Sequence, residues 1–397
     1  MKNLGRIFIV SSSLGEYEDS HAIRILNYLP QGKKLSRVRL VGIGDGILDG
    51  LRVCDSMFRP RAQVNKGAFK KYSFSWFRAN ISHKFVYPDQ FKGWARYLNG
   101  RLAGELTAND ILITASGSIE AHKFGLLAKE KHPDLLWIAD FGDPWWITSK
   151  AINPLFGKWA KKDEQKILAG ADVVLVTTQA TKELFLSNEP KANVHTIFYG
   201  YTEIVRKVLR GNESQSFHSG QIGAGYEGNR NLLPYLTALD SLDLKLRKEV
   251  TLAGPRSSSF DEYVKQSKSL KMFKQLERVD YSTSLEMLSG LDLFLIVGNK
   301  SSLQLPGKLF VALASDIPIL YISQATNDAA LDILKMFPGV LVSKENDVKT
   351  IHEQLEIFFS KTEQINAAAG RRVKSSRLLE YSRKNNWDKL SSLFGQR

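Results

Sequence analysis

The sequence predicts an α/β protein built from two doubly wound domains, each with a parallel sheet covered by helices on both faces. The chain has 397 residues, which is too many for one ordinary hydrophobic core. Short, almost continuously apolar runs alternate with helical patterns, as is typical of parallel strands that are buried on both faces. A polar stretch at 203–216 interrupts this alternation, which then restarts.

The first predicted domain spans residues 1–204. Its apolar runs are rich in β-branched and aromatic residues, which favours strands. The predicted strands are 6–10, 37–43, 110–116, 135–141, 171–178 and 194–200. Helical patterns at 119–131 and 163–170 separate some of these runs, so we expect the strands to run parallel.

The second predicted domain spans residues 205–379. Its predicted strands are 216–222, 249–254, 277–282, 291–298, 317–322 and 339–343. Ligands of such sheets bind outside the carboxyl ends of the strands. In a tandem pair, we expect these ends to face each other across a cleft.

Charge and cysteine content narrow the classes of function. Lys and Arg number 55 against 41 Asp and Glu, and the formal net charge of +14 favours an anionic partner. Cys54 is the only cysteine, which excludes an internal disulfide and a cysteine-rich zinc site. No apolar run approaches the ~20 residues of a membrane span, and the first residues are typical of a strand rather than a signal peptide. We therefore expect a cytoplasmic protein.

The segment 56–88 combines basic and aromatic residues and contains no Asp or Glu. Its seven Lys or Arg alternate with aromatic residues such as Trp76, which suits an anionic membrane surface at which the protein would be peripheral. A loop with its aromatic residues packed in the core explains the pattern equally well. The composition also suits a nucleic acid strand, but no RNA- or DNA-binding module is evident, so we do not expect a nucleic acid partner.

Two stretches of the first domain carry candidate site residues. After the first strand, Ser13 and Gly15 could let backbone amides approach a phosphate, although an ordinary capped turn is the simpler explanation. No GxGxxG pattern is present there, so a dinucleotide fingerprint is not supported. Farther on, His122, Asp140 and Asp143 follow neighbouring strands and could orient a sugar or handle a proton. The alternatives are a packed core histidine and an aspartate that caps a helix.

Two stretches of the second domain also carry candidates. A glycine-rich turn that includes Gly223 precedes Arg230, and a guanidinium beside such backbone suits a diphosphate. In LQLPGKLFVALA (303–314), Lys308 lies in the first turn of a predicted helix, where a cation opposes the helix dipole unless an anion is bound. The alternatives are a solvated arginine and a lysine that points into solvent.

Taken together, these stretches resemble the retaining sugar-nucleotide glycosyltransferases of the GT-B fold, in the group 1 or family-4-like class. IADFGDPWW (138–146) looks like the family's Asp-Phe-Arg-Asp-x-Trp segment, with Gly142 where Arg is common. TIFYGYTE (196–203) is similar to its Asn-Gly-Tyr-Asp turn. Three further segments are similar to the family in the same order: 163–185, 279–297 and 305–320. The terminal helix, 380–397, is similar to the one that crosses back onto the first domain.

The resemblance implies a nucleoside-diphosphate sugar as donor, bound by the second domain, and a glycan or lipid-linked acceptor on the first. Arg230 and Lys308 would stabilise the leaving diphosphate, and His122 would lie near the transferred sugar. The implied donor-binding residues are Ser13, Gly15, Gly223, Gly254, Gln304, Pro306, Gly307, Leu309 and Val311. The acceptor-side residues would be Asp140, Asp143 and Trp76. The family usually needs no metal, so we expect neither a metal nor another cofactor.

One departure from the family stands out. The family carries two glutamates with seven residues between them in the helix region near Lys308, and the second one binds the ribose hydroxyls. Leu303 and Val311 occupy these positions here, and neither side chain can accept a hydrogen bond. Glu227 or Glu286 could replace the missing carboxylate in space.

The resulting hypothesis is a glycosyltransferase of surface polysaccharide biosynthesis that works at the inner face of the membrane. The altered ribose contact motivates an alternative of another class, a non-catalytic GT-B-like protein that binds a glycan or a partner. A weaker alternative, motivated by the charge, is transfer of a sugar to DNA.

Overall fold

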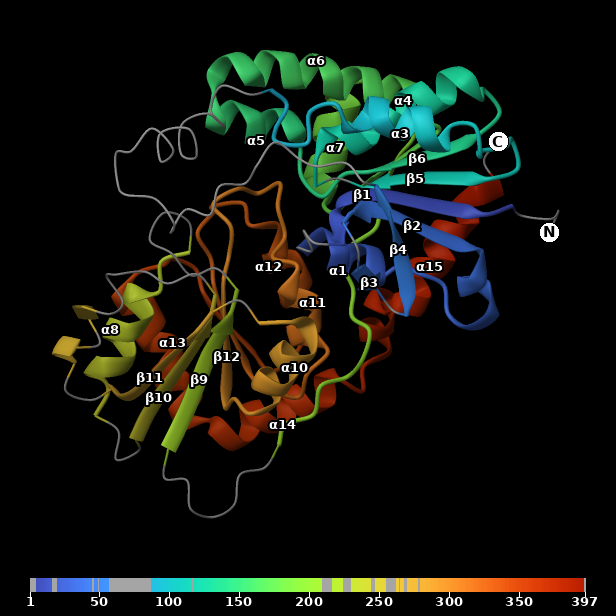
Figure 1. The fold of residues 1–397 in the computed structure, drawn as a ribbon. Coiled ribbons are helices and arrows are strands. Elements are labelled where there is room, and N and C mark those ends of the chain that lie inside the picture. Colours follow the sequence, from blue (N-terminus) through green and yellow to red (C-terminus); the bar gives the residue numbers. More distant parts are fainter. Residues whose placement is uncertain are drawn as a thin grey trace. The chain divides into compact units, whose positions relative to one another are not determined.

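The computed structural model divides the chain into two compact units, shown in Figure 1. The first comprises Met1–Tyr199 with Arg383–Arg397, and the second comprises Gly200–Ser382. The expected boundaries were 204/205 and 379/380. The structure describes residues 5–15, 20–44, 46–48, 50–56, 87–115, 117–208, 216–223, 230–243, 247–254, 262–263, 265–267, 270–277 and 279–395.

The first unit is built on an eight-stranded sheet in the order β3-β4-β2-β1-β5-β6-β7-β8. Its pairs are parallel except for β3 with β4. The strands are β1 (Ile7–Gly15), β2 (Val38–Ile43), β3 (Gly46–Leu48), β4 (Leu51–Ser56), β5 (Ile111–Ala115), β6 (Leu136–Asp140), β7 (Val173–Val176) and β8 (Val194–Thr196). The hairpin formed by β3 and β4 was not predicted from the sequence.

Helices cover both faces of this sheet. They are α1 (Ser20–Leu26), α3 (Trp94–Leu102), α4 (Ile119–Lys131), α5 (Trp145–Ile152), α6 (Pro154–Gly170), α7 (Gln179–Asn188) and α15 (Arg383–Ser392). Alternate residues of β1 enter two separate cores, because successive side chains of a strand point to opposite faces. Phe8 and Val10 pack in the core with α3, α4, α6 and α7. Ile7 and Ile9 pack in the core with α1 and α15.

The C-terminal helix α15 belongs to the first unit. Its Leu390 is fully buried in the core that also contains α1. The Arg383 guanidinium donates to the carbonyl oxygens of Leu29 and Pro30, at 3.0 and 3.2 Å. The chain therefore returns to its first unit after it has completed the second.

The second unit is built on a six-stranded parallel sheet in the order β11-β10-β9-β12-β13-β14. Its strands are β9 (Ser216–Ile222), β10 (Arg247–Ala253), β11 (Leu270–Leu276), β12 (Leu293–Val297), β13 (Ile319–Ile322) and β14 (Val340–Ser343). Its helices include α8 (Leu233–Ser241), α10 (Tyr281–Ser289), α11 (Lys308–Leu313), α12 (Ala329–Leu334), α13 (Val348–Ser360) and α14 (Thr362–Arg372). All five residues of β12 are buried, so elements cover both faces of this sheet.

Some predicted elements differ from the structure. The strand predicted at 277–282 is wrong, because β11 ends at Leu276 and α10 begins at Tyr281. The segment 163–170 is the second half of a longer helix, α6. The helix predicted at 119–131 is confirmed as α4. Among the described residues, no helix combines the length and hydropathy needed to cross a bilayer.

Candidate functional site

The second unit has its topological switch point between β9 and β12. The sheet grows from β9 to β10 and β11 on one side, and from β12 to β13 and β14 on the other. Connections therefore leave β9 and β12 toward opposite sides, and ligands of doubly wound sheets bind at this point, outside the carboxyl ends of the strands. Gly223 follows β9 and Asn299 follows β12, so both residues lie at this edge.

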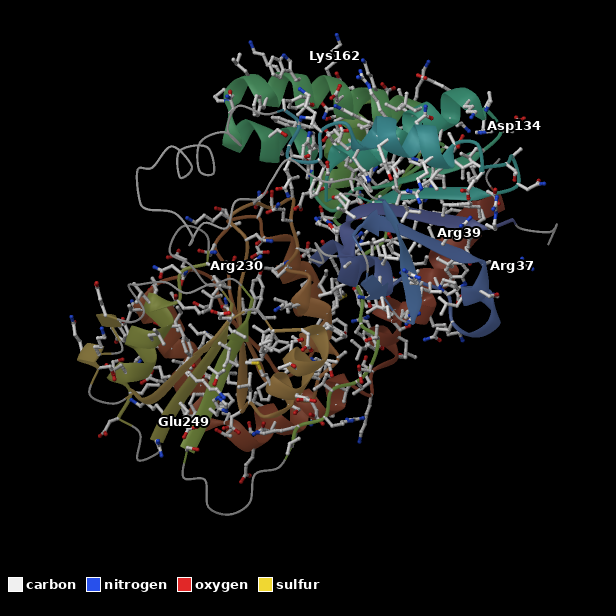
Figure 2. All side chains as sticks on the ribbon, in the orientation of Figure 1. Arg37, Arg39, Asp134, Lys162, Arg230 and Glu249 are labelled. Carbon is white, nitrogen blue, oxygen red and sulfur yellow. The ribbon has the colours of Figure 1, made fainter. Side chains whose placement is uncertain are left out.

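Arg230 is held at this edge by a neighbouring strand. Its Nη2 donates to Oδ1 of Asn299 at 2.8 Å, and Figure 2 shows Arg230 beyond the carboxyl ends of the sheet. Only one nitrogen of the guanidinium makes this bond, and the group carries five N–H donors in a planar fork. The carboxamide thus orients the cation and leaves it donors suited to two oxygens of an anion.

Lys308 reaches the same edge from α11. Its Nζ lies 3.2 Å from the position that a Cβ on Gly223 would occupy, so its stem extends over this glycine. Gly223 has φ of +118°, a conformation that other residues rarely adopt, and its N–H donates to the carbonyl of Ala253 at 2.6 Å. Gly254, at the end of β10, also has a positive φ, and its N–H donates to Leu276. The end of β9 and the start of α11 therefore bring Gly223 and Lys308 together.

Two side-chain amides hold the backbone of this edge in place by hydrogen bonds. Gln324 Nε2 donates to the carbonyl of Gly298 at 2.6 Å, which fixes the segment just before Asn299. Asn346 Nδ2 donates to the carbonyl of Asn231 at 2.9 Å. These bonds tie the segments after β12, β13 and β14 to the residue that follows Arg230.

The helix α11 is shorter than the sequence suggested. It has six residues, begins at Lys308, and its N-cap Gly307 provides no side-chain hydrogen bond. A helix of this length contributes little dipole, so side chains would supply most of the attraction for an anion. Leu309 and Pro306 are buried, whereas Gln304 and Val311 are partly exposed.

Of the described carboxylates, neither Asp328 nor Glu286 is placed to replace the missing ribose ligand. Asp328 is buried and accepts hydrogen bonds from Tyr321 and Ser323, at 2.7 and 2.9 Å. Glu286 is exposed near the end of α10, which leads to the amino end of β12, at the opposite edge. Glu227 lies outside the described residues.

The first unit has its own switch point, between β1 and β5. Ser13 and Gly15 form the last part of β1 and are buried. Gly15 has φ of +83°, and a Cβ there would lie 2.4 Å from the carbonyl oxygen of Ile43. A Cβ on Gly117, after β5, would lie 2.2 Å from Oγ of Ser13. Close packing between neighbouring strand ends is therefore sufficient to explain why both positions are glycine.

His122 lies in α4, just behind this edge. Its Nδ1 is 2.8 Å from Oγ1 of Thr114, which also accepts a hydrogen bond from Nε1 of Trp137 at 2.9 Å. The ring stacks on Phe141, and its centroid is 4.3 Å away. The side chain is fully buried, and Nε2 has no hydrogen-bond partner among the described residues. Burial lowers the pKa of His122 to about 3, so the imidazole is neutral at physiological pH.

Asp140 is engaged in a buried ion pair. Arg24 binds its carboxylate through Nε and Nη2, the latter at 2.5 Å, and donates from Nη1 to the carbonyl of Ile197 at 2.7 Å. Tyr28 also donates to Asp140, at 3.1 Å. Both partners of the ion pair are about 1% exposed. This network joins α1, β6 and the segment after β8, so Asp140 stabilises the first unit.

The remaining acceptor-side candidates lie in different environments. Asp143 is partly exposed between β6 and α5. It is not the N-cap of α5, which is Pro144, and Glu164 of α6 accepts from the first amide of the helix, Trp145 N, at 2.7 Å. Trp76 lies outside the described residues.

Sequence reasoning missed two residues that organise these edges. Asn299 follows an apolar strand at a switch point, a position that could have marked it as a partner for an arginine. Arg24 lies in an amphipathic helix, where a buried arginine has no distinguishing sequence signal. Within the described residues, no group of three or more His, Cys, Asp or Glu is arranged to hold a metal ion.

Solved structures show which fold this is. The chain is similar to sucrose-phosphate synthase from Thermosynechococcus elongatus, with a TM-score of 0.66 and 12% identity over 98% of both chains. It is similar to HepE from Anabaena, solved with UDP and glucose, with a TM-score of 0.62 and 12% identity over 98% of both chains. A protein from Listeria monocytogenes assigned as a UDP-N-acetylglucosamine 2-epimerase gives 0.61 and 11% identity, over 98% of this chain and 95% of that one.

These similarities establish the GT-B fold, with two Rossmann-like units, as the resemblance implied. Identities near 12% establish the fold and leave the reaction to be argued from the site. No protein-family model matches the chain, and no curated protein is significantly similar to it in sequence.

Proposed function

We propose that the protein is a glycosyltransferase that transfers a sugar from a nucleoside-diphosphate sugar to a glycan or lipid-linked acceptor in surface polysaccharide biosynthesis. The observation that carries the proposal is the placement of two cations at the switch-point edge of the second unit, with Arg230 bonded to Asn299 and Lys308 extended over Gly223. Two cations at one edge of the sheet suit a diphosphate, which has two charged groups to pair. The solved structure of HepE contains UDP and glucose, so this fold accommodates such a ligand.

In the proposed reaction, Arg230 and Lys308 act mainly on the leaving group. An acceptor hydroxyl oxygen bonds to the anomeric carbon of the sugar, the bond between that carbon and the diphosphate breaks, and negative charge develops on the diphosphate. Cations already held in place by Asn299 and α11 stabilise this charge without reorganising. We propose that the reaction is metal-independent and retaining, and that the departing phosphate takes the acceptor proton.

A non-catalytic GT-B-like protein is the second candidate. Leu303 and Val311 stand where the resembled family has carboxylates, and Asp328 is already engaged with Tyr321 and Ser323. A donor site without a ribose ligand would bind a nucleotide more weakly. Such a protein would bind a glycan or a partner and catalyse no transfer.

Donor turnover separates the two candidates. Purified protein is incubated with a panel of nucleotide sugars and candidate acceptors, and release of nucleoside diphosphate is measured. We expect release with the correct pair, and a loss of roughly 100-fold in kcat for Lys308→Ala, because a preorganised charge at the leaving group is removed. Lys361→Ala, at an exposed position after α13, is the matched control and should retain full turnover.

Two results would count against the catalytic proposal. Glycan or partner binding by a protein that shows neither turnover nor a thermal shift with any nucleotide would favour the non-catalytic candidate. Equal turnover in the Lys308→Ala and Lys361→Ala variants would refute the role given to Lys308.

A further inference from the structure

The helix α6 carries an exposed stripe that the proposed donor site does not use. Five residues at helical spacing make up this α6 stripe: Leu155, Lys158, Trp159, Lys162 and Lys166. Positions three, four, seven and eleven residues apart fall on one side of a helix, so these side chains share one face. All five are exposed, and Figure 2 shows Lys162 on the outer side of α6.

The apolar part of the stripe is unusual for a surface. Leu155 is 60% exposed and Trp159 is 52% exposed, one helical turn apart. Trp159 is held in place from behind, because its ring packs edge-on against Tyr87 at 5.5 Å and stacks with Phe156 at 5.8 Å. A large aromatic ring that is fixed in position yet half exposed is suited to contact with something outside the chain.

The charges of the stripe have one sign. The two acidic residues of α6 are engaged by residues of other elements. Asp163 is 2.8 Å from both Tyr87 Oη and Lys123 Nζ, and Glu164 is buried against the start of α5. Both carboxylates of α6 are therefore already engaged elsewhere, and the exposed charges of the stripe itself are the three lysines.

This combination selects one kind of partner. An acidic protein surface would match the lysines but would leave Leu155 and Trp159 against polar groups. A nucleic acid strand would take the charges and one ring but would give Leu155 nothing apolar to contact. An anionic lipid surface offers both, because its headgroups pair with lysines while indole and leucine side chains lie at the headgroup and acyl boundary.

We propose that the α6 stripe docks the chain on an anionic lipid surface, with Leu155 and Trp159 inserted at headgroup level and the three lysines on the acidic headgroups. The proposal deepens the proposed function, because a lipid-linked acceptor is presented at such a surface. It concerns a described helix, whereas residues 57–86 of the segment expected to contact a membrane lie outside the described residues. Docking itself requires no donor and no transfer.

Cosedimentation with vesicles tests the proposal in the absence of any nucleotide sugar. The unmodified chain should bind phosphatidylcholine vesicles that contain phosphatidylglycerol, and should bind pure phosphatidylcholine much more weakly. Lys158→Gln with Lys162→Gln should weaken binding at least about tenfold, since each lysine near an anionic surface contributes several-fold in affinity. The matched control is Lys361→Gln with Lys374→Gln, which removes the same charge from exposed positions in the second unit.

The apolar contribution has its own variant. Leu155→Ser leaves the charge unchanged and keeps the contacts of Trp159 with Tyr87 and Phe156, so it should fold normally and still bind less tightly. Equal binding of the Lys158/Lys162 variant and its control, or equal binding to both kinds of vesicle, would overturn the proposal. Turnover with a water-soluble acceptor should be unchanged in the Lys158/Lys162 variant, so failure of docking and failure of transfer are seen separately.

Discussion

At the scale of single residues, the first unit contains two kinds of buried polar group, one fully paired and one only partly paired. In the first unit, Arg24 and Asp140 satisfy each other, and the pair is structural. His122 is satisfied at Nδ1 by Thr114 but has no partner at Nε2 among the described residues. An unpaired nitrogen in a buried ring costs stability, which a protein accepts most readily where a ligand supplies the missing bond.

The burial of His122 predicts a specific pH dependence. Its pKa is about 3 in the folded chain, against about 6.5 in an unfolded one. Between these values the unfolded state binds a proton that the folded state does not, so stability falls as the pH drops below about 6.5. The loss is at most about 1.4 kcal/mol per pH unit for this one group.

His122→Gln removes this titration while it keeps a polar side chain. We expect the free energy of urea unfolding of the variant, taken as a difference from the unmodified chain, to increase as the pH is lowered from about 7 to about 5, because only the unmodified chain loses this contribution to stability. Because both proteins contain the same carboxylates, the contribution of these groups to the pH dependence cancels when the two are compared at each pH. A difference that does not change with pH would show that His122 is not held neutral.

At the scale of elements, the helix that carries Lys308 is fastened at its other end. Arg372 of α14 is fully buried and donates to carbonyl oxygens at the end of α11, on the segment leading to β13, and before β14. Its acceptors are Ala312, Leu313, Ser315, Ile317, Pro338 and Gly339, at 2.7 to 3.4 Å. Carbonyls at a helix end lack partners within the helix, and the guanidinium supplies them.

Arg372→Lys should therefore be strongly destabilising. An ammonium group cannot reach acceptors spread over three segments, so several buried carbonyls would lose their partner, at about 1–3 kcal/mol each. We expect the free energy of unfolding of the second unit to fall by roughly 3 kcal/mol or more. Arg371→Lys, at an exposed neighbouring position, is the control and should change it by less than about 0.5 kcal/mol. Similar stability of the two variants would contradict this account of α11.

The same scale shows what the sequence could predict. Apolar strands such as 291–298 were found because burial on both faces leaves a continuous signal. Edge strands are harder to predict: β11 reads LKMFKQL, whose lysines weaken the apolar pattern, and the neighbouring ERVDYS has the stronger strand pattern although its described residues form no strand. The strand β1 continues through Ser11 to Ser13 because backbone pairing and burial override a polar composition.

The candidate site likewise has some features that the sequence could predict and others that it could not. Arg230 and Lys308 could be singled out because each follows a turn at the expected end of a strand. The bond between Arg230 and Asn299 joins residues 69 positions apart, and no local pattern encodes such a pair. The short length of α11 was also hidden, because its apolar run LFVAL is equally typical of a longer helix.

At the scale of the whole molecule, the chain consists of two doubly wound units, and each has its switch point at a glycine-lined edge. The GT-B fold is established by similarity to solved structures over 98% of the chain. The fold does not select a reaction, since a protein named as a sucrose-phosphate synthase and one named as an epimerase share it. The central claim therefore rests on the edge of the second unit and its two cations.

A crystal structure of the chain with UDP tests this claim most directly. We expect the diphosphate outside the carboxyl ends of β9 and β12, with its oxygens within hydrogen-bond reach of both Arg230 and Lys308 and the ribose near Val311. A diphosphate bound elsewhere on the chain, or UDP at this edge with neither cation in contact, would contradict the account.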